Sequence, residues 1–451
     1  MARQIDLSNV QGTVVHLYRR PIVRHLLLHF TDAQGGRAFL RELAPTLTMA
    51  DAQPDSLPDP LVNVGLTFSG LGALRVDPRL LDKFDTMYKG GPDANALGDV
   101  AGSDSDPANW WEGRFTTPDV HCIVHLYLRT DAAVEPASAK VRDAARRFSV
   151  SELIPRRDGT VLDARSLGGA KLHFGYTDGI SHPDISWQDV PDDRSQIDFR
   201  NFLLGYSTAD HGSAPATGPA ADLVRDSTYA AFRWIYQDVA AFNQVLSTHG
   251  PRLFPRLSPA DAEELLAAKM LGRWRDGTPL VLSPEHPDPG LTRSNDFGYA
   301  SEDPRGLRCP FSAHIRVVNP RDQPLDPIVE AIPKVIRRGM PYGPPLQSAQ
   351  DDGQDRGIIG IFLCADIRRQ IYTLTRWIKR NDFSPVYDAN RRRQDAVVAN
   401  RAVPGADAGF SIPGDAGDAT IPALPDLVRT KGTALLLYPS RSTLGGVAGD
   451  A

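Results

Sequence analysis

Two kinds of apolar segment alternate along this chain, and their order constrains the fold more than any other feature of the sequence. Strand-like runs occupy residues 25–32, 62–66 and 120–128, and helix-like runs occupy 35–47 and 136–147. The strand-like runs are short and rich in branched or aromatic residues, whereas the helix-like runs repeat their apolar residues every three to four positions. This succession is compatible with a split βαβ sandwich, in which helices cover one antiparallel sheet.

The same succession returns in the second half of the chain. Strand-like runs occupy residues 229–237, 357–366 and 433–440, and helix-like runs occupy 237–246, 261–271 and 367–380. Ser258, Pro259 and Asp261 form a helix-start signature before the second of these helices. The stretch 383–431 is rich in Gly and Pro without periodicity, which predicts loops. The sequence therefore predicts an α+β chain of two similar units.

Composition excludes several classes of protein. The 451 residues are about three times the usual length of one domain, ~150 residues, so more than one core is expected. Lys and Arg number 50 against 55 Asp and Glu, a net charge of −5, and no apolar run has membrane-spanning length. We therefore expect neither nucleic-acid binding nor membrane insertion.

The cysteines and the start of the sequence bear on location. Cys122, Cys309 and Cys364 form no CxxC pair, which argues against a disulfide framework and against a thiolate zinc site. The first residues lack the basic-then-apolar order of a secretory signal. Both observations favour a cytoplasmic protein in a reducing environment.

Eleven histidines raise the question of a metal site. His25 and His29, like His121 and His125, are four residues apart, a spacing that chelates a metal only on a helix. Both pairs lie in strand-like runs, where four residues span ~13 Å. We interpret these histidines as core or sheet-face residues.

His314 has a different environment, because arginines surround it in sequence. Arg316 and Arg321 follow it, and the pair Arg337 and Arg338 begins 23 residues later. Guanidinium groups bind carboxylate oxygens in bidentate fashion, so this neighbourhood suits the carboxylates of a bound cofactor. Taken alone, His314 also fits a structural role.

The segment FGYTDGISHPDI places Asp178 between Gly175 and Gly179. Glycines at these positions allow a tight turn and a close approach to a ligand, so the carboxylate is presented from a constrained turn. The same residues are also typical of a simple Asx turn.

Together and in this order, these segments resemble the dye-decolorizing peroxidases, a family of haem enzymes built from two ferredoxin-like units. GYTDG at 175–179 matches the family's GxxDG motif, CPFSAHIRVVNPR at 309–321 is similar to its proximal-ligand segment, and VIRRGMPYG at 335–343 is similar to its distal-arginine segment. Weaker likenesses extend over almost the whole chain, and the length and the CPFSAHIR form resemble the larger, fungal-like branch. The resemblance implies two ferredoxin-like units in an α+β fold, one at 1–185 that ends in the GxxDG segment and one at 186–451 that carries the haem ligand.

The resemblance also implies roles for individual residues. His314 would be the axial ligand of the iron in one haem b per chain, Asp178 the distal acid/base and Arg337 the distal arginine. Arg321 would pair with a haem propionate, and Gly175 and Gly179 would shape the turn at the cofactor. Arg338 competes with Arg337, because the sequence does not show which of two adjacent arginines points inward. The acidic partner expected for the proximal histidine has no motif that locates it.

The sequence departs from the family pattern at two places. His182 stands where the family is expected to have a polar amide, and GIIGIFLC at 357–364 lacks a phenylalanine at its fourth position. Ile361 or Phe362 is the alternative residue to line the distal pocket.

The resemblance implies a peroxidase that uses hydrogen peroxide to oxidise dyes and other aromatic or phenolic donors through a ferryl intermediate. A carboxylate and a fixed cation suit this chemistry, because a base must move a proton between the peroxide oxygens while a cation stabilises the developing charge. The alternatives are a haem-handling or haem-sensing protein without turnover and a ferredoxin-like binding module without haem. The assembly state, including a homo-oligomer, stays open.

A surface radical site for bulky donors is a further hypothesis. Trp377 and Tyr372 lie on the predicted helix 367–380. The alternative, which we favour, is an amphipathic helix whose aromatic residues cover the core.

Overall fold

The computed structural model describes residues 5–188, 196–206, 218–327, 332–380, 382–386 and 393–449. Up to residue 165 its strands are β1 (Ile22–Phe30), β2 (Leu61–Leu66), β3 (Cys122–Leu128), β4 (Val150–Leu153) and β5 (Leu162–Arg165). The helices of this part are α1 (Gly12–Val15), α2 (Ala33–Leu43), α3 (Phe68–Ala73), α4 (Pro78–Leu81), α5 (Thr86–Gly90), α6 (Ala94–Leu97) and α7 (Val134–Arg147).

The remainder of the chain supplies further strands and helices. The strands are β6 (Ile185–Ser186), β7 (Ile197–Asp198), β8 (Thr228–Gln237), β9 (Ile336–Arg337), β10 (Met340–Tyr342), β11 (Gly357–Cys364), β12 (Phe410–Ile412), β13 (Ala419–Ile421) and β14 (Val428–Tyr438). The helices are α8 (Gly218–Val224), α9 (Val239–Leu253), α10 (Pro259–Leu271), α11 (His314–Val318), α12 (Thr373–Lys379) and α13 (Arg441–Ala448).

One ten-stranded sheet organises the molecule. Its strands follow the order β10-β11-β8-β14-β2-β3-β1-β4, with β5 paired to β1 and β9 paired to β11. These neighbours are antiparallel, and strands from the two halves of the chain meet where Leu437 of β14 pairs with Leu66 of β2. The α+β class that the sequence predicts is confirmed, while the division at residue 185 stays a prediction.

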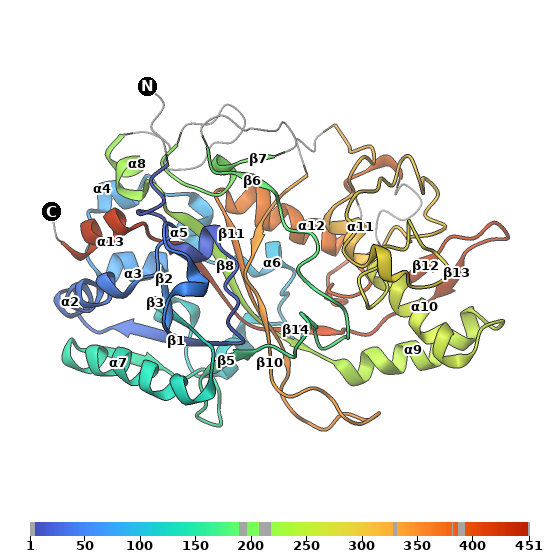
Figure 1. The fold of residues 1–451 in the computed structure, drawn as a ribbon, viewed down its shortest axis with the longest axis horizontal. Helices are drawn as coiled ribbons and strands as arrows, with labels where there is room; N and C mark the ends of the chain where they lie inside the picture. The colour runs from blue at the N-terminus through green and yellow to red at the C-terminus, as the bar shows by residue number, and fades with distance from the viewer. Residues whose placement is uncertain are drawn as a thin grey trace.

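The helices form where capping residues and apolar periodicity coincide. The Ser258 side chain accepts a hydrogen bond from the Asp261 amide at the start of α10, as the helix-start signature predicts. The buried residues of α7 repeat every three to four positions and include Val134, Val141 and Ala145. Figure 1 shows α2 and α7 beside the N-terminal strands on the left and α9 and α10 on the lower right.

The core lies between strands of the two halves. The ring of His25 on β1 packs edge-on against Phe232 on β8, and the Tyr438 hydroxyl on β14 lies 2.7 Å from His125 Nε2 on β3. His25 and His125 also share a hydrogen bond of 2.7 Å between their Nδ1 atoms, and both are buried. The structure thus confirms that these are core histidines, and the described residues contain no cluster of three or more His, Cys, Asp or Glu able to hold a metal ion.

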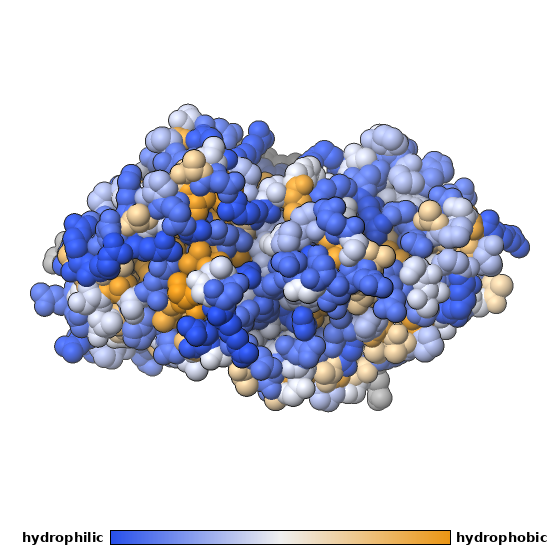
Figure 2. Space-filling view, turned by 90° about the horizontal axis from the view of Figure 1, so that it is seen from below, coloured by the Kyte–Doolittle hydropathy of each residue, from blue (hydrophilic) through white to orange (hydrophobic). Residues whose placement is uncertain are grey.

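In the described part of the chain no helix combines the length and apolarity that crossing a bilayer demands. The face shown in Figure 2 is mostly hydrophilic, with apolar residues in small separate patches.

One local prediction is wrong, and another is confirmed with a difference in the type of helix. The stretch 383–431, predicted as loops, contains the hairpin of β12 and β13. Its strands are only three residues long, which is too short for a period of two to be visible in the sequence. The predicted helix 367–380 begins with a π-helical turn over Ile367–Tyr372 before α12.

Candidate active site

Asp178 lies in a turn whose backbone is fixed on both sides. Gly175 and Gly179 have φ angles of +89° and +78°, a region that other residues rarely adopt. The Asp178 amide donates to the Ala170 carbonyl at 2.9 Å, and the Arg275 carbonyl accepts hydrogen bonds from the amide and the hydroxyl of Thr177, both at 3.1 Å. The carboxylate is therefore presented from a rigid support.

Arg337, on β9, faces this carboxylate. Its Nη2 lies 3.4 Å from Asp178 Oδ1 and 3.3 Å from the Ser181 carbonyl oxygen, to which it donates. The side chains of Arg337 and Asp178 are 34% and 35% exposed, so both can still contact a ligand. Arg338 instead donates from Nε to the Thr13 carbonyl at 2.7 Å. The geometry favours Arg337 over Arg338 as the partner of Asp178.

Phe362 lies beside this pair. It is the register partner of Arg337 in the antiparallel pairing of β9 and β11, so both side chains share one face of the sheet. Its ring covers Gly360, where an added Cβ would lie 2.6 Å from a ring carbon. Ile361 is buried in the core. Of the two alternatives for the distal pocket, the structure places Phe362 on the Arg337 side.

His314 begins α11 and is oriented by a carboxylate that the sequence did not reveal. Its Nδ1 lies 2.7 Å from Oδ2 of Asp395, whose side chain is fully buried. Asp395 Oδ1 accepts from the Val397 and Val398 amides at 2.8 and 3.0 Å. Burial would raise the pKa of Asp395, but the charge and hydrogen bond of His314, together with these amides, hold the pKa below its usual value. His314 Nε2 has no hydrogen-bond partner among the described residues.

Arg316 has a structural role rather than a role in the site. It is fully buried, pairs with Asp303 at 3.1 Å and donates to the Cys309 carbonyl at 2.7 Å. Of the arginines that surround His314 in the sequence, Arg316 is therefore not available to bind a ligand.

Three cations gather near the end of α11 without a carboxylate partner among the described residues. Arg321 and Arg273 both donate to the side-chain oxygen of Asn295, at 2.7 and 3.0 Å, and Lys334 Nζ lies 3.1 Å from Asn319 Oδ1. Arg321 Nε is buried and has no hydrogen-bond partner. Burial, and then the charge of Arg321, lower the pKa of Lys334 to about 8 and that of Arg273 to about 10. These three side chains form a positive cluster that no carboxylate of the described residues balances. Of the three, only Arg321 is predicted as a binding residue from the sequence.

One loop, which follows α10, touches both candidate segments. Gly272 approaches Ile315, the neighbour of His314, so closely that a Cβ would lie 2.5 Å from Ile315 Cγ1. Five residues later, a Cβ on Gly277 would lie 2.7 Å from Ile180 Cδ1, in the Asp178 segment. The loop therefore joins the His314 side and the Asp178 side of the site.

The proposed surface aromatic residues are not at the surface. Trp377 is fully buried and stacks on Phe383 at 4.2 Å between ring centroids. Tyr372 is 8% exposed, and its hydroxyl accepts from the Asp93 amide at 3.0 Å. Both residues cover the core, in line with the favoured alternative.

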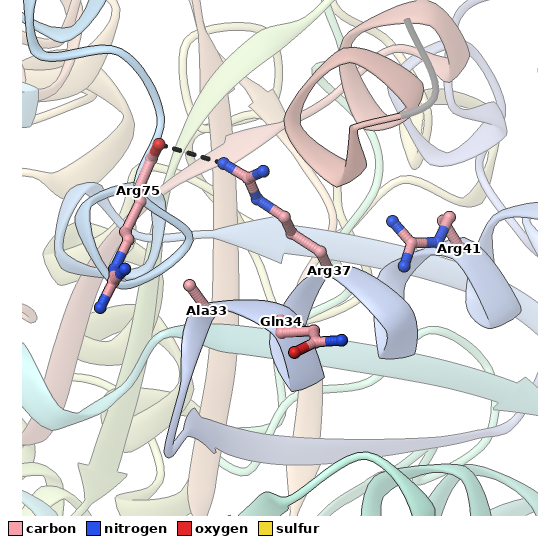
Figure 3. Close-up of a pocket in the computed structure, with 5 residues that line it drawn as sticks. All are labelled: Ala33, Gln34, Arg37, Arg41 and Arg75. Carbon is pink, nitrogen blue, oxygen red and sulfur yellow. Dashed lines mark hydrogen bonds between the residues drawn. The ribbon is translucent and has the colours of Figure 1, made fainter.

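A second arginine cluster lies elsewhere in the fold. A recess of about 330 Å³ at α2 is lined by Arg37, Arg41 and Arg75 together with Ala33 and Gln34, as Figure 3 shows. Arg37 donates to the carbonyls of Leu74 and Arg75, and Arg41 to that of Ala448, so these side chains cap the ends of α3 and α13. We assign this cluster to helix capping.

Comparison with known proteins supports the resemblance that the motifs indicate. No model of a known family matches the sequence. Among curated proteins, the chain is 29% identical over 405 residues to a dye-decolorizing peroxidase of Mycena epipterygia, covering 84% of this chain and 73% of that protein. It is 26% identical over 466 residues to a dye-decolorizing peroxidase of Auricularia auricula-judae, covering 99% and 87%.

Solved structures show the same fold along nearly the whole chain. An ancestral D-type dye-decolorizing peroxidase is 25% identical, with a TM-score of 0.81 and coverage of 99% of this chain and 100% of that one. A dye-decolorizing peroxidase in complex with 2,6-dimethoxyphenol is 24% identical, with a TM-score of 0.82 and the same coverage. The predicted ferredoxin-like architecture is the fold of these neighbours. In its sequence relatives and in its fold, the chain is similar to the dye-decolorizing peroxidases, the family that its motifs resemble, and fungal enzymes are among its relatives.

Proposed function

We propose that this chain is a haem peroxidase that binds one haem b and uses hydrogen peroxide to oxidise dyes and other phenolic or aromatic donors. The observation that supports the proposal is the presence of two pairs of side chains in one site. Asp395 orients His314, and Arg337 faces Asp178. A relative was solved with a phenol, 2,6-dimethoxyphenol, which supports the donor class. The three cysteines are free and buried, which supports a cytoplasmic setting.

The residues present fit haem. Because Asp395 occupies Nδ1 of His314, the other ring nitrogen is left to ligate iron, which is the usual arrangement of a metal-binding histidine. The cluster of Arg321, Arg273 and Lys334 lacks carboxylates and so suits the two propionates. Bound there, haem supplies the iron that accepts peroxide and stores the oxidising equivalents.

The polypeptide would supply the proton transfer and the charge stabilisation. Asp178 would accept the proton from the peroxide oxygen that stays and return it to the oxygen that leaves. Arg337, held by Ser181 and the sheet, would stabilise the negative charge that develops during this transfer. A haem-handling protein without turnover would not need this pair, so the pair favours the peroxidase over that alternative.

Turnover tests the proposal. Protein reconstituted with haem should oxidise an anthraquinone dye when peroxide is added, and protein without haem should not. A reconstituted protein with an intact Soret band but no peroxide-dependent oxidation of any dye or phenol would contradict the proposal and favour the haem-handling alternative.

Lys334→Met should have opposite effects on apoprotein stability and haem retention. Because burial lowers the Lys334 pKa, the charged amine destabilises the apoprotein, and its removal should stabilise the apoprotein by on the order of 3 kcal/mol at pH 7. This difference should shrink as the pH rises from about 8 to about 10.5, where the wild-type amine is neutral in the folded state but still protonated in the unfolded state. Haem loss should become about 10-fold faster, because a charged donor to a propionate is removed.

Denaturant unfolding of the apoprotein and haem transfer to apomyoglobin measure the two effects. Lys83→Met is the matched control, because the Lys83 side chain is 68% exposed, and it should change neither quantity. If wild type and Lys334→Met lose haem at the same rate, Lys334 does not bind a propionate.

A further inference from the structure

A second recess lies at the segment that follows Asp178 in the chain. It has a volume of about 310 Å³ and lies between the segment that follows α1 and the start of β6. Its apolar lining includes Val15, Leu17, Ile185 and Trp187. Leu17 is 56% exposed and is the more exposed of the two large apolar side chains that the described residues leave open to solvent. Val15, Ile185 and Trp187 are half-buried, so the apolar lining of the recess is only partly covered by protein.

The polar lining connects the recess to the catalytic pair. His182 and Arg338 both line it. A Cβ on Gly179 would lie 3.8 Å from His182 Nε2, so the imidazole contacts the Asp178 turn, and the charges of both Arg337 and Asp178 act on it. His182 Nδ1 is buried without a hydrogen-bond partner among the described residues, a costly state that a ligand hydroxyl would relieve.

The chemistry of the lining selects a class of ligand. The guanidinium of Arg338 is balanced by the carboxylate of Asp184, which also lines the recess, so the site has no strong preference for an anion or a cation. An indole wall binds aromatic rings well, and a volume of about 310 Å³ lies at the small end of ligand pockets. The recess therefore suits a neutral molecule with one aromatic ring and a hydroxyl group.

We propose that the recess binds a small neutral phenol, with its ring against Trp187 and Leu17 and its hydroxyl hydrogen-bonded to His182. This proposal rests on the proposed peroxidase function and names the site at which a small donor is oxidised. The phenol gives one electron to the oxidised enzyme and its hydroxyl proton to the free nitrogen of His182, and a phenoxyl radical leaves. His182 then releases the proton to solvent, and a second phenol completes the use of one peroxide.

The state of His182 agrees with this role. Burial, and then the charges of Arg337 and Arg338, lower its pKa, so the imidazole is neutral near neutral pH and readily releases a proton that it has taken up. A glutamine at this position would keep a hydrogen-bonding group but could not take up the proton.

Direct binding tests the site without turnover. Saturation-transfer NMR on the resting, haem-loaded protein should detect 2,6-dimethoxyphenol with wild type, and the signal should fall at least about 5-fold with Trp187→Ala. Leu257→Ala is the control, because Leu257 is the other exposed large apolar residue and does not line the recess. No signal with wild type, or equal signals for wild type and Trp187→Ala, would overturn the proposal.

Kinetics separate this inference from the proposed function. Trp187→Ala should raise KM for 2,6-dimethoxyphenol about 10-fold with kcat little changed, whereas His182→Gln should lower kcat about 10-fold with a smaller change in KM. Neither variant should change the rate at which peroxide oxidises the enzyme. If both variants oxidise the phenol with the KM and kcat of wild type, the recess is not the phenol site. If wild type binds the phenol but does not oxidise it, the proposed peroxidase function is wrong.

Discussion

Arg337→Leu should slow the oxidation of the haem-loaded enzyme by peroxide about 100-fold or more, which is the scale of losing one preorganised donor at a developing charge. Arg337 is the only one of the two adjacent arginines that lies near Asp178, at 3.4 Å in the described structure. Leucine keeps some of the volume but supplies no charge. Stopped-flow absorbance at increasing peroxide concentration gives the rate constant.

Arg338→Leu is the matched control for this prediction. Its guanidinium donates to the carbonyls of Thr13 and Val14, so the variant should lose stability, on the order of 1–3 kcal/mol for an acceptor left unpaired. Its peroxide reaction should stay within about threefold of wild type. If Arg338→Leu slowed the peroxide reaction about 100-fold and Arg337→Leu did not, Arg338 would be the arginine that acts with Asp178.

His314→Ala should abolish stable haem binding, because the protein then offers the iron no ligand. Asp395→Asn should retain haem but bind it about 10- to 100-fold more weakly, the usual effect of losing the partner of a metal-bound histidine. It should also raise the Fe(III)/Fe(II) potential, since the imidazole becomes a weaker electron donor when it loses the carboxylate. Haem titration followed by absorbance and spectroelectrochemistry measure both properties.

If His314→Ala kept the five-coordinate spectrum of wild type, another histidine would be the ligand of the iron. His173 is a poor candidate, because its Nε2 is hydrogen-bonded to the Tyr342 carbonyl at 2.8 Å. His182 would be the next residue to replace.

Periodic segments and motifs made much of the fold predictable. The strand at β1, the helix at α2 and the Ser258 cap of α10 carry local signals, and each occurs where those signals predict it. The histidine pairs were interpreted correctly, because a strand separates residues four apart too far for one metal ion. The hairpin of β12 and β13 was missed, because three-residue strands give no period.

The site was less predictable, because its partners are assembled by long-range contacts. Asp395 is 81 residues from His314 in sequence and lies among many other aspartates in Gly- and Pro-rich segments, so only the folded structure selects it. Lys334 carries no motif either, and its importance arises from burial next to Arg321. The choice between Arg337 and Arg338 depends on side-chain direction on β9, which the sequence does not encode locally.

The most direct test of the central claim is the absorption spectrum of haem-loaded protein before and after one equivalent of hydrogen peroxide, recorded by stopped flow for wild type and Asp178→Asn. The account predicts that wild type loses Soret intensity within milliseconds to seconds and that Asp178→Asn does so about 100-fold more slowly, because an amide cannot accept and return the proton. Asparagine nearly preserves the shape of the side chain, so the Soret band before peroxide should be the same in both proteins. A wild-type spectrum that peroxide leaves unchanged would contradict the peroxidase, and an Asp178→Asn variant that reacts at the wild-type rate would show that Asp178 does not carry the proton.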